Sequence, residues 1–385
     1  MSTLSYRFYE FFAGAGMARA GLSSFGMNCI FANDFDHKKS CTYKKNWGEG
    51  ELRTTDVNLL TPLDLPDYAE FVWASFPCQD LSLAGGGAGL KGDRSGTFWP
   101  FWRLMQGLIA EGRAPHVIAL ENVCGTLTSH GGKDFTTICE TFRLAGYRFG
   151  ALVIDAALFV PQSRPRLFMI GIHSDLPIPA NVIGAEPSAA WHPKALRTAF
   201  DRLPSEAKTN WLWWHLPTPT LSNCTFANLI EDTPNSVAWQ SPAETEQLLG
   251  MMSAVNRAKV EQAKKVGRRM VGTIYKRTRR DENGLKAQRA EVRFDDRAGC
   301  LRTPAGGSSR QFILVVDADG VKSRLISSRE TARLMGLPDT YILPTNYNEA
   351  YHLTGDGVVV PVVRHLAEYL FIPLLANVSK GSGSF

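Results

Sequence analysis

Cys78 is the residue whose type and position best suit covalent chemistry. It follows Pro77 at the end of the apolar run of residues 71–74, which is typical of a buried strand. Proline cannot donate to a strand ladder, so the thiol should lie at the carboxyl edge of a sheet, where open α/β sheets bind ligands. A buried cysteine usually behaves as a small apolar residue, so nucleophilic chemistry requires neighbours that favour the thiolate. The Gly- and Ser-rich residues 79–96 are predicted to form a mobile loop that can close over the thiol.

Further polar side chains are predicted at the same edge of the sheet. Glu121 directly follows the apolar residues 116–120, which are typical of a strand in a parallel sheet. Arg164 and Arg166 precede another apolar strand at residues 167–171. Guanidinium groups at that position can orient a carboxylate or bind a base oxygen.

A strand, a glycine turn and a helix are predicted near the N-terminus. The aromatic residues 7–12 are followed by Gly14 and Gly16, and a helical pattern begins at Met17. This order is typical of the first βα unit of a site for a nucleotide-like ligand. The third glycine of the dinucleotide fingerprint is absent, which argues against NAD.

The tips of the next two predicted strands carry residues that suit an adenosine. Asp34 lies about 20 residues after the glycine turn, where an acid can accept hydrogen bonds from ribose hydroxyls. Asp36 is a second candidate for the ribose, Phe35 can stack on the adenine, and Asp56 is placed for the adenine edge. No phosphate-cradling motif accompanies them, so S-adenosylmethionine fits better than a nucleotide phosphate.

The composition is that of a globular protein with an uneven charge distribution. The chain has 385 residues, enough for two domains, and a net charge of +5. Residues 255–310 contain 16 Lys or Arg and 6 Asp or Glu, a local charge of +10, which leaves −5 for the remainder. This imbalance favours one basic module that binds a polyanion. Seven scattered cysteines predict a reducing cytoplasm. We expect no membrane span, because no window of about 18 apolar residues is apparent.

A second domain is predicted after about residue 175, where Pro-rich segments replace the alternation of strands and helices. Its tryptophans are expected to form a small separate core: Trp211, Trp213, Trp214 and Trp239. Residues 300–311 form a Gly/Ser-rich turn that is either a plain hairpin or a DNA contact. The flanking charge favours DNA, because an arginine such as Arg310 can pair with guanine, and a glutamine such as Gln311 with adenine.

Together these residues resemble the motifs of the DNA cytosine-C5 methyltransferases, in family order and over nearly the whole chain. Six blocks carry the resemblance: residues 12–16 (FAGAG), Pro77-Cys78-Gln79 with Ser82, Glu121-Asn122-Val123, residues 162–166 (QSRPR), Arg329-Glu330 with residues 333–338, and residues 355–361. The resemblance implies an α/β fold. It consists of the Rossmann-like sheet of S-adenosylmethionine-dependent methyltransferases and a second, smaller, irregular and β-rich target-recognition domain.

The resemblance also implies domain bounds and a reaction. The catalytic, cofactor-binding domain would occupy residues 1–185 and the target-recognition domain residues 186–345. Residues 346–385 would form a C-terminal helix that completes the catalytic domain, followed by a flexible tail. The reaction would be the sequence-specific transfer of a methyl group from S-adenosylmethionine to C5 of a cytosine flipped out of duplex DNA. Cys78 would add covalently to C6, and the base would be held by Glu121, Arg164 and Arg166.

Two further sets of residues follow from the motifs and the charge pattern. The cofactor-binding set is Phe12, Ala13, Gly14, Gly16, Asp34, Phe35, Asp56, Val57, Asp356 and Val358. The DNA-binding set is Gln79, Ser82, Arg94, Arg277, Arg279, Arg302, Ser308, Ser309, Arg310 and Gln311. Asp356 departs from the family, which usually has Asn there. This carboxylate either alters contacts at the methionine end of the cofactor or is a neutral variant.

The biological setting implied by the resemblance is DNA methylation in a prokaryotic restriction-modification system. The enzyme would be encoded by a bacterium or a phage and act in the cytoplasm as a monomer, without a metal or a membrane. A cognate restriction endonuclease can belong to such a system. The alternatives are a tRNA cytosine-C5 methyltransferase, a catalytically silent DNA-binding homologue and, disfavoured by the glycine pattern, a nicotinamide oxidoreductase.

Overall fold

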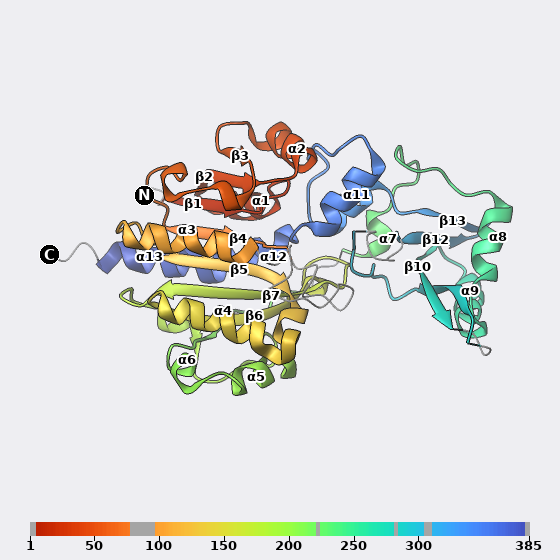
Figure 1. The fold of residues 1–385 in the computed structure, drawn as a ribbon. Coiled ribbons are helices and arrows are strands. Elements are labelled where there is room, and N and C mark those ends of the chain that lie inside the picture. The colour runs from red at the N-terminus through yellow and green to blue at the C-terminus, as the bar shows by residue number, and fades with distance from the viewer. Residues whose placement is uncertain (1–4, 78–96, 221–223, 281–283, 304–309, 382–385) are drawn as a thin grey trace. The chain divides into compact units, whose positions relative to one another are not determined.

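The computed structural model describes residues 5–77, 97–220, 224–280, 284–303 and 310–381 (Figure 1). The chain forms two compact units. Unit 1 comprises Met1–Asp155, Pro165–Thr220 and Val358–Phe385. Unit 2 comprises Ala156–Arg164 and Leu221–Gly357. These units differ from the domain bounds expected from the sequence, because residues 186–220 group with unit 1 and residues 346–357 with unit 2.

Unit 1 is built on a seven-stranded mixed sheet, which confirms the expected α/β fold. Its strands, in spatial order, are β3 (Leu52–Thr54), β2 (Met27–Asp34), β1 (Tyr6–Phe11), β4 (Phe71–Ala74), β5 (Val117–Val123), β7 (Pro165–His173) and β6 (Tyr147–Asp155). The first five strands pair in parallel, and β7 pairs antiparallel with both β5 and β6. The carboxyl ends of β1, β2, β4 and β5 therefore share one edge with the start of β7.

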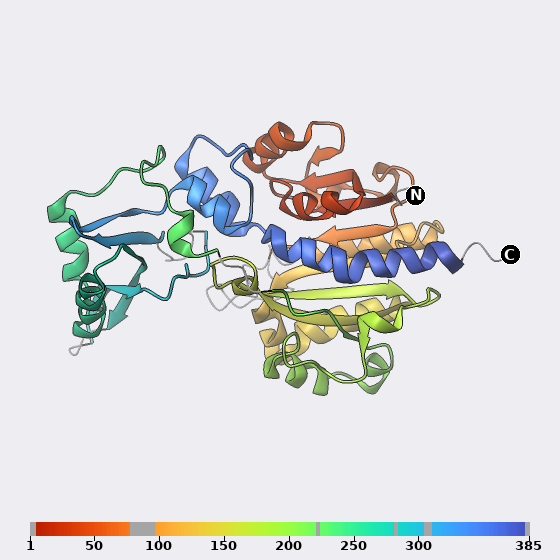
Figure 2. The same cartoon turned by 180° about the vertical axis from the view of Figure 1, so that it is seen from behind.

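Helices cover both faces of this sheet, as the front and back views show (Figures 1 and 2). The helices of unit 1 are α1 (Met17–Leu22), α2 (His37–Trp47), α3 (Phe98–Ala110), α4 (Lys133–Leu144), α5 (Lys194–Asp201), α6 (Ser205–Thr209), α12 (Val360–Leu366) and α13 (Ile372–Gly381). On one face, Phe11 of β1 contacts Phe101 of α3 at a ring distance of 5.1 Å. On the other face, Phe71 of β4 contacts Phe371, between α12 and α13, at 4.7 Å. Alternate side chains of the strands thus feed two apolar layers.

Three tryptophans expected in the second domain belong to the core of unit 1. Trp211 packs edge-on against Phe149 of β6 at 5.8 Å and also contacts Trp213 at 5.3 Å. The indole of Trp214 donates to the carbonyl oxygen of Ile170 at 3.3 Å. The short pair of β8 (Ile183–Gly184) and β9 (Trp213–Trp214) holds this segment beside the main sheet. The Pro-rich composition after residue 175 therefore marks an irregular extension of unit 1, and not the boundary of a new domain.

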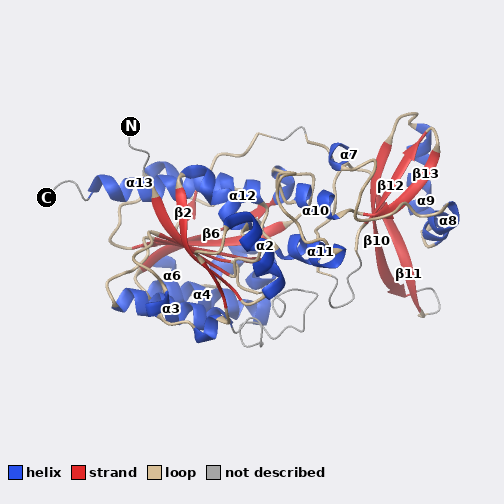
Figure 3. Cartoon of the chain, turned by 90° about the horizontal axis from the view of Figure 1, so that it is seen from above, coloured by secondary structure: helices blue, strands red, loops and turns tan. Residues whose placement is uncertain are grey.

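Unit 2 contains a separate antiparallel sheet, which Figure 3 shows with its strands in red. Its strand order is β11 (Lys286–Arg293), β10 (Met270–Arg280), β12 (Phe312–Asp317) and β13 (Gly320–Leu325). Its helices are α7 (Phe226–Leu229), α8 (Pro242–Gly250), α9 (Ala254–Lys265), α10 (Ser328–Leu334) and α11 (Tyr347–Asp356). Helices α8 and α9 contribute Leu248 and Val260 to a core shared with Ile274 and Leu314 of the sheet. The expectation of a smaller, β-rich second unit is thus confirmed.

A buried ion pair links the last strand of unit 2 to the helix that follows it. Arg324 of β13 and Glu330 of α10 are both fully buried, and their closest atoms lie 2.6 Å apart. Glu330 also completes a capping box with Ser327 at the start of α10. The same carboxylate accepts from the backbone N–H of Glu231 at 2.6 Å, which ties in the segment before α8.

One helical run has the length and composition of a membrane span. Tyr347–Val378 reaches a mean hydropathy of 1.6 in its most apolar window, so the expectation that the chain has no such window is corrected. About 67% of that window is buried inside the protein, as in a core helix. Gly357 also interrupts the run between α11 and α12, since its ψ of 167° is extended. The run is therefore weak evidence for a span.

Candidate active site

The glycine turn (residues 12–16) connects the end of β1 to α1 at the carboxyl edge of the sheet. Phe12, Gly14 and Gly16 all have positive φ, at 55°, 57° and 80°. A positive φ costs energy for a bulky residue such as Phe12, and such strain is often kept at functional sites. A Cβ added to Gly14 would meet no atom within 4 Å, so the turn is open on that side. The geometry can therefore admit a ligand close to the backbone.

Asp34 at the tip of β2 fastens this turn from the neighbouring strand. Its carboxylate accepts from the backbone N–H of Gly14 and from that of Asp36, each at 2.8 Å. Burial raises the pKa of the Asp34 carboxyl above its usual value. The structure therefore brings together the turn and the acid that the sequence singled out, and gives the acid two backbone donors besides any ligand.

Trp47, which the sequence analysis did not single out, packs behind the same turn. Its indole donates to the carbonyl oxygen of Ala15 at 3.1 Å. A Cβ on Gly16 would lie 2.4 Å from the indole nitrogen, so only glycine fits at this position. The Arg19 guanidinium stacks over the Trp47 ring at 5.1 Å and donates to the Tyr43 hydroxyl at 2.9 Å. Residues of α2 thus hold the glycine turn from behind.

Glu10 is a second residue near this turn that sequence reasoning missed. It lies on β1, is only 1% exposed, and accepts from the backbone N–H of Arg19 in the first turn of α1 at 3.1 Å. Burial raises the pKa of the Glu10 carboxyl to about 8. An acid within the mostly aromatic strand Tyr6–Phe11 was the signal that could have identified it.

The other cofactor candidates occupy the tips of β2 and β3. Phe35 is 68% exposed, as a stacking residue should be before its ligand binds. Asp36 caps α2, because its side chain accepts from the backbone N–H groups of Lys38 and Lys39. Asp56 likewise caps a short turn by accepting from Asn58 N at 2.8 Å, while Val57 is buried. Both acids therefore shape their loops, and Phe35 is left presented to solvent.

The segment that leads to Cys78 is held by neighbouring strands of unit 1. After β4, the Ser75 hydroxyl accepts from the Trp73 indole at 2.9 Å. The carbonyl oxygen of Phe76 accepts from the side chain of Asn122 on β5 at 3.3 Å. Asn122 thus fixes the chain two residues before the cysteine. Four predicted site residues lie outside the described residues: Cys78, Gln79, Ser82 and Arg94. The whole predicted loop of residues 79–96 also lies outside them, and the description of the chain stops at Pro77 and resumes at Thr97.

Glu121 and Arg166 form an ion pair at the same edge of the sheet. Glu121 Oε1 and Arg166 Nε lie 3.2 Å apart, and the two side chains are 9% and 16% exposed. They come together because β7 runs antiparallel to β5, so the start of β7 lies beside the end of β5. Removal from bulk water strengthens such a pair. The pair places a carboxylate and a guanidinium next to the strand that leads to Cys78.

The structure assigns Arg164 a different role from the one expected. It is 2% exposed, and its terminal nitrogens donate to the carbonyl oxygens of Leu301 at 2.8 Å, Gly355 at 2.8 Å and Gly357 at 2.7 Å. It also contacts the Cys300 sulfur at 3.4 Å. With its terminal N–H groups engaged in this way, Arg164 joins three segments of unit 2. It is a structural anchor and not a group that binds the target base.

Gln311 is likewise not available to contact DNA bases. It is fully buried, and both ends of its amide pair with the backbone of Gly299, at 3.0 and 3.2 Å. Arg310 donates to the side chain of Asn348 and lies over the Tyr347 ring at 5.8 Å. Its neighbours Ser308 and Ser309 lie outside the described residues. The expectation that Gln311 contacts adenine is therefore wrong, because the side chain is needed to close its own turn.

The remaining DNA candidates are exposed, and so is the cofactor candidate Asp356 at the end of α11, whereas the cofactor candidate Val358 is buried. Arg277, Arg279 and Arg302 are solvent-exposed. Asp356 of unit 2 accepts a hydrogen bond from the Thr303 hydroxyl. Thr303 lies two residues after Leu301, whose carbonyl oxygen Arg164 binds. Val358 of unit 1 is 5% exposed and packs as a core residue. These contacts give Asp356 a local role in unit 2 that the sequence did not indicate.

Three of the described cysteines, Cys29, Cys124 and Cys139, are poor candidates for a thiolate. Burial raises the pKa of the Cys29 thiol to about 12 and that of Cys124 to about 11, and it raises the pKa of Cys139 well above the usual value. Such thiols stay protonated near neutral pH. In the part of the chain that the structure describes, no group of three His, Cys, Asp or Glu side chains is arranged to hold a metal ion.

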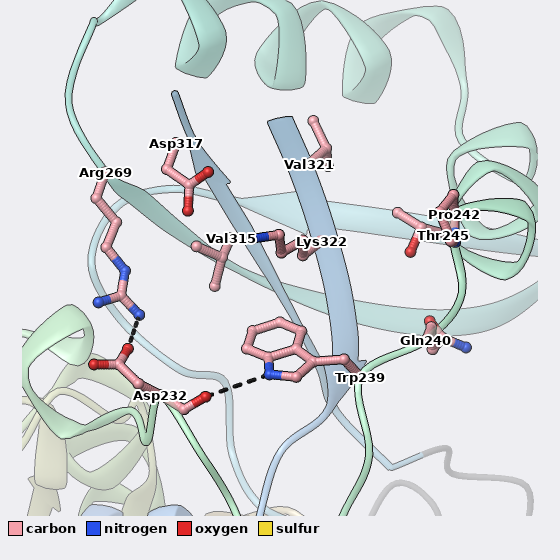
Figure 4. A pocket seen from close by; sticks show the side chains of 10 residues that line it. All are labelled: Asp232, Trp239, Gln240, Pro242, Thr245, Arg269, Val315, Asp317, Val321 and Lys322. Carbon is pink, nitrogen blue, oxygen red and sulfur yellow. Dashed lines mark hydrogen bonds and ion pairs between the residues drawn. The ribbon is translucent and has the colours of Figure 1, made fainter. Parts of the chain in front are cut away.

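A pocket of about 550 Å³ lies in unit 2, and none of the residues that line it was predicted for the site. Figure 4 shows Trp239 and the Arg269–Asp232 ion pair along its wall. The two charged groups lie 2.6 Å apart, and the Trp239 indole donates to the Asp232 carbonyl oxygen at 3.4 Å. Lys322, also on the wall, lies 3.7 Å from Asp319. Arg269 and Asp232 therefore neutralise each other, Lys322 pairs with an acid outside the lining, and we assign no ligand to the pocket.

Comparison with known proteins gives consistent results over almost the full chain. Residues 6–371 match the family model described as C-5 cytosine-specific DNA methylase. The chain is 26% identical to the type II methyltransferase M.NgoBI of Neisseria gonorrhoeae, over 98% of this chain and 97% of that protein. It is 25% identical to M.HhaI of Haemophilus parahaemolyticus, over 94% and 93%. Among solved structures, DNMT2 of Spodoptera frugiperda has a TM-score of 0.62 at 17% identity, covering 95% of this chain and all of that one. A putative DNA modification methyltransferase of an Escherichia coli prophage has a TM-score of 0.57 at 16% identity, over 98% and 100%.

Proposed function

The chain belongs to the C-5 cytosine-specific DNA methylases and is a DNA cytosine-5 methyltransferase, and we propose that it works by covalent catalysis on a cytosine flipped out of duplex DNA. The observation that carries this proposal is the Glu121–Arg166 pair, which lies at the carboxyl edge beside the strand that leads to Cys78. A reaction on a base needs this combination of an acid and a cation near a nucleophile.

The methyl donor of this family is S-adenosylmethionine, and the residues of unit 1 fit it. The glycine turn leaves open space beside Gly14, and Phe35 presents an exposed ring at the tip of β2. We propose that the turn and Asp34 hold the methionine and ribose parts, with Phe35 against the adenine. When bound, the cofactor supplies an electrophilic methyl group. The work of the protein is to hold the cytosine and the thiol beside it.

In the proposed reaction, the Cys78 thiolate adds to C6 of the cytosine. The carboxyl group of Glu121 hydrogen-bonds N3 and the exocyclic amine, and it thereby offsets the charge that develops on the ring. Arg166 orients Glu121 through their 3.2 Å contact. C5 would then take the methyl group, and the donor would leave as S-adenosylhomocysteine. A base, a role that water can fill, would accept the C5 proton, and departure of the thiolate would release 5-methylcytosine. Arg164 has no part in these steps, because it anchors segments of unit 2.

Access to the base requires flipping, because a stacked duplex hides C6 from a thiol; the cost is a few kcal/mol. We propose that unit 2, including its exposed residue Arg302, recognises the target sequence and thereby makes methylation sequence-specific. The biological setting that we propose is a type II modification system of a prokaryotic cell, which the likeness to the type II methyltransferases M.NgoBI and M.HhaI supports. We further propose a cytoplasmic monomer, with a cognate endonuclease as its partner in that system.

Methylation mapping tests this proposal directly. The purified protein is incubated with S-adenosylmethionine and unmodified plasmid DNA, and 5-methylcytosine is then located by sequencing. We expect modification confined to one short motif. Cys78→Ala should abolish turnover while the protein still binds DNA, whereas the control Cys41→Ala, at an exposed position on α2, should retain wild-type turnover.

Two results would contradict the mechanism. Wild-type turnover in Cys78→Ala would remove that thiol from the reaction. Modification of tRNA but not of DNA would replace the proposed substrate, and the fold would remain that of a cytosine methyltransferase.

A further inference from the structure

Strands β10 and β11 extend beyond the rest of the sheet in unit 2. β10 pairs with β12 only over residues 270–274, whereas it pairs with β11 from Thr273 to Arg280. Residues 275–280 of β10 and 286–291 of β11 therefore form a two-stranded ribbon, which we call the basic ribbon. β11 is also the edge strand of the sheet, and among the described residues its outer side is paired only at an isolated bridge between Met252 and Ala290.

The basic ribbon concentrates positive charge. It contains Lys276, Arg277, Arg279, Arg280, Lys286 and Arg289, with Glu291 as its one acid. Its net charge of +5 equals that of the whole 385-residue chain. The pairing register places Arg277 opposite Arg289 and Arg280 opposite Lys286. Like charges directly across a strand pair are destabilising, so folding of the ribbon does not account for these residues.

The register also divides the basic residues equally between two faces, because side chains alternate along a strand and cross-strand partners share a face. One face, which we call the arginine face, carries Arg277, Arg279 and Arg289. The opposite face carries Lys276, Arg280 and Lys286, with Thr278 and Gln288 between them. Lys276 is turned onto the ring of Phe312 at 4.5 Å. Each face therefore carries three positive charges. On the arginine face all three are guanidinium groups, whereas two of the three on the opposite face are ammonium groups.

The arginine face is organised for recognition of an anion. Glu291 lies 3.3 Å from Arg277 and 2.7 Å from Arg279, so one carboxylate holds two exposed guanidinium groups in place. Charge on this face remains positive, since Arg289 adds a third guanidinium. Planar guanidinium groups bind phosphate through paired hydrogen bonds, which an ammonium group cannot form.

The same face continues toward a segment that the sequence associates with DNA. Tyr275, which precedes Arg277 on that face, donates through its hydroxyl to the carbonyl oxygen of Cys300 at 3.0 Å. Exposed Arg302 follows two residues later. The arginine face and Arg302 thus belong to one connected part of unit 2.

We propose that the basic ribbon is a DNA arm that lays its arginine face on the phosphates of the duplex. The inference rests on the proposed function, because the partner is the duplex substrate itself. Phosphate contacts fix the position of a protein on DNA without reading its sequence. The arm should therefore set affinity and salt dependence, and leave the methylated motif and the chemical step unchanged.

Two triple variants with matched charge test which face binds. Arg277→Gln, Arg279→Gln and Arg289→Gln together neutralise the arginine face, and Lys276→Gln, Arg280→Gln and Lys286→Gln neutralise the opposite face. Each full-length variant is titrated with a fluorescent duplex over a range of salt concentrations. The Kd for S-adenosylmethionine and kcat at saturating DNA are measured in parallel as tests of folding.

The arginine-face variant is expected to raise the Kd for DNA at least about 10-fold. The association constant for DNA should also fall less steeply with salt. The magnitude of the slope of its logarithm against the logarithm of the salt concentration should be smaller by about 2 to 3, since each lost phosphate contact removes about 0.9. Its kcat at saturating DNA and its methylated motif should match the wild type. The opposite-face variant should change the Kd less than about threefold.

Equal losses of DNA affinity in the two variants would overturn the inference, because they would show that only the total charge matters and that neither face is preferred. An arginine-face variant with wild-type affinity and slope would also overturn it, as would a change of methylated motif. These results differ from failure of the proposed function, in which the wild-type protein itself would methylate no DNA.

Discussion

Glu10 is the residue whose protonation the fold controls most strongly among the carboxyl groups at the cofactor edge. It is buried on β1, and one of its oxygens accepts from the backbone N–H of Arg19. Burial raises its pKa from the usual 4.5 to about 8. The group is therefore protonated in the folded protein near neutral pH but ionised in the unfolded chain. Its contribution to stability is fully present below pH 4.5 and is lost as the pH rises through 8.

We predict that Glu10→Gln removes this pH dependence, because the amide keeps the shape of the protonated carboxyl group and cannot ionise. The free energy of unfolding of the wild type should fall relative to that of the variant between pH 5 and 8.5, by up to about 1.4 kcal/mol per pH unit. Urea unfolding of both proteins at several pH values measures the difference. A difference that stays constant with pH would show that Glu10 does not titrate in this way.

At the scale of elements, unit 2 combines an apolar core with buried ion pairs and hydrogen-bonded anchors. Arg324 and Glu330 link β13 to α10, and Glu330 also receives the backbone of Glu231. Arg164 likewise connects Leu301 to the end of α11 through carbonyl oxygens. Such buried polar groups stabilise a fold only while all their partners are present.

Glu330→Gln is therefore expected to destabilise unit 2 by roughly 3 to 5 kcal/mol, because it leaves the buried Arg324 without a counter-charge. Urea unfolding followed by tryptophan fluorescence reports the change, since Trp239 stacks on Arg324 at 4.8 Å. Glu261→Gln is the matched control in the same unit. It breaks an exposed pair with Lys264 and should cost less than about 0.5 kcal/mol. Equal losses of unfolding free energy in the two variants would mean that the buried ion pair stabilises the protein no more than the exposed one does.

At the scale of the whole molecule, cofactor binding should stabilise the folded chain. A ligand at 100 times its Kd contributes about 2.7 kcal/mol. S-adenosylmethionine should therefore raise Tm by several degrees, and NAD should not. Phe35→Ala should reduce the shift without changing the Tm of the free protein, because the ring is 68% exposed. Leu144→Ala, at a 74% exposed position on α4, is the control and should leave the shift intact. A shift with NAD alone would contradict the assigned cofactor.

The sequence by itself determined the features that depend on local pattern. Apolar runs predicted the strands β4 and β5, and the glycine turn was found because positive φ at Gly14 and Gly16 requires that residue type. The sequence also predicted that Glu121 and Arg166 lie at the same edge of the sheet, because each stands where an apolar strand meets that edge. The structure brings them together there as an ion pair.

Only the tertiary structure decided the roles that depend on distant partners. Arg164 looked like a base-binding residue, but its acceptors lie 137 to 193 positions away in the chain, where no local pattern can reveal them. Gln311 closes its own turn against Gly299, and Trp211 packs on Phe149 rather than in a second domain. Charge alone likewise indicated that residues 255–310 are basic. The division of that charge between the two faces of a ribbon emerged only from the pairing register of β10 and β11, because the two faces are defined by which residues lie opposite one another.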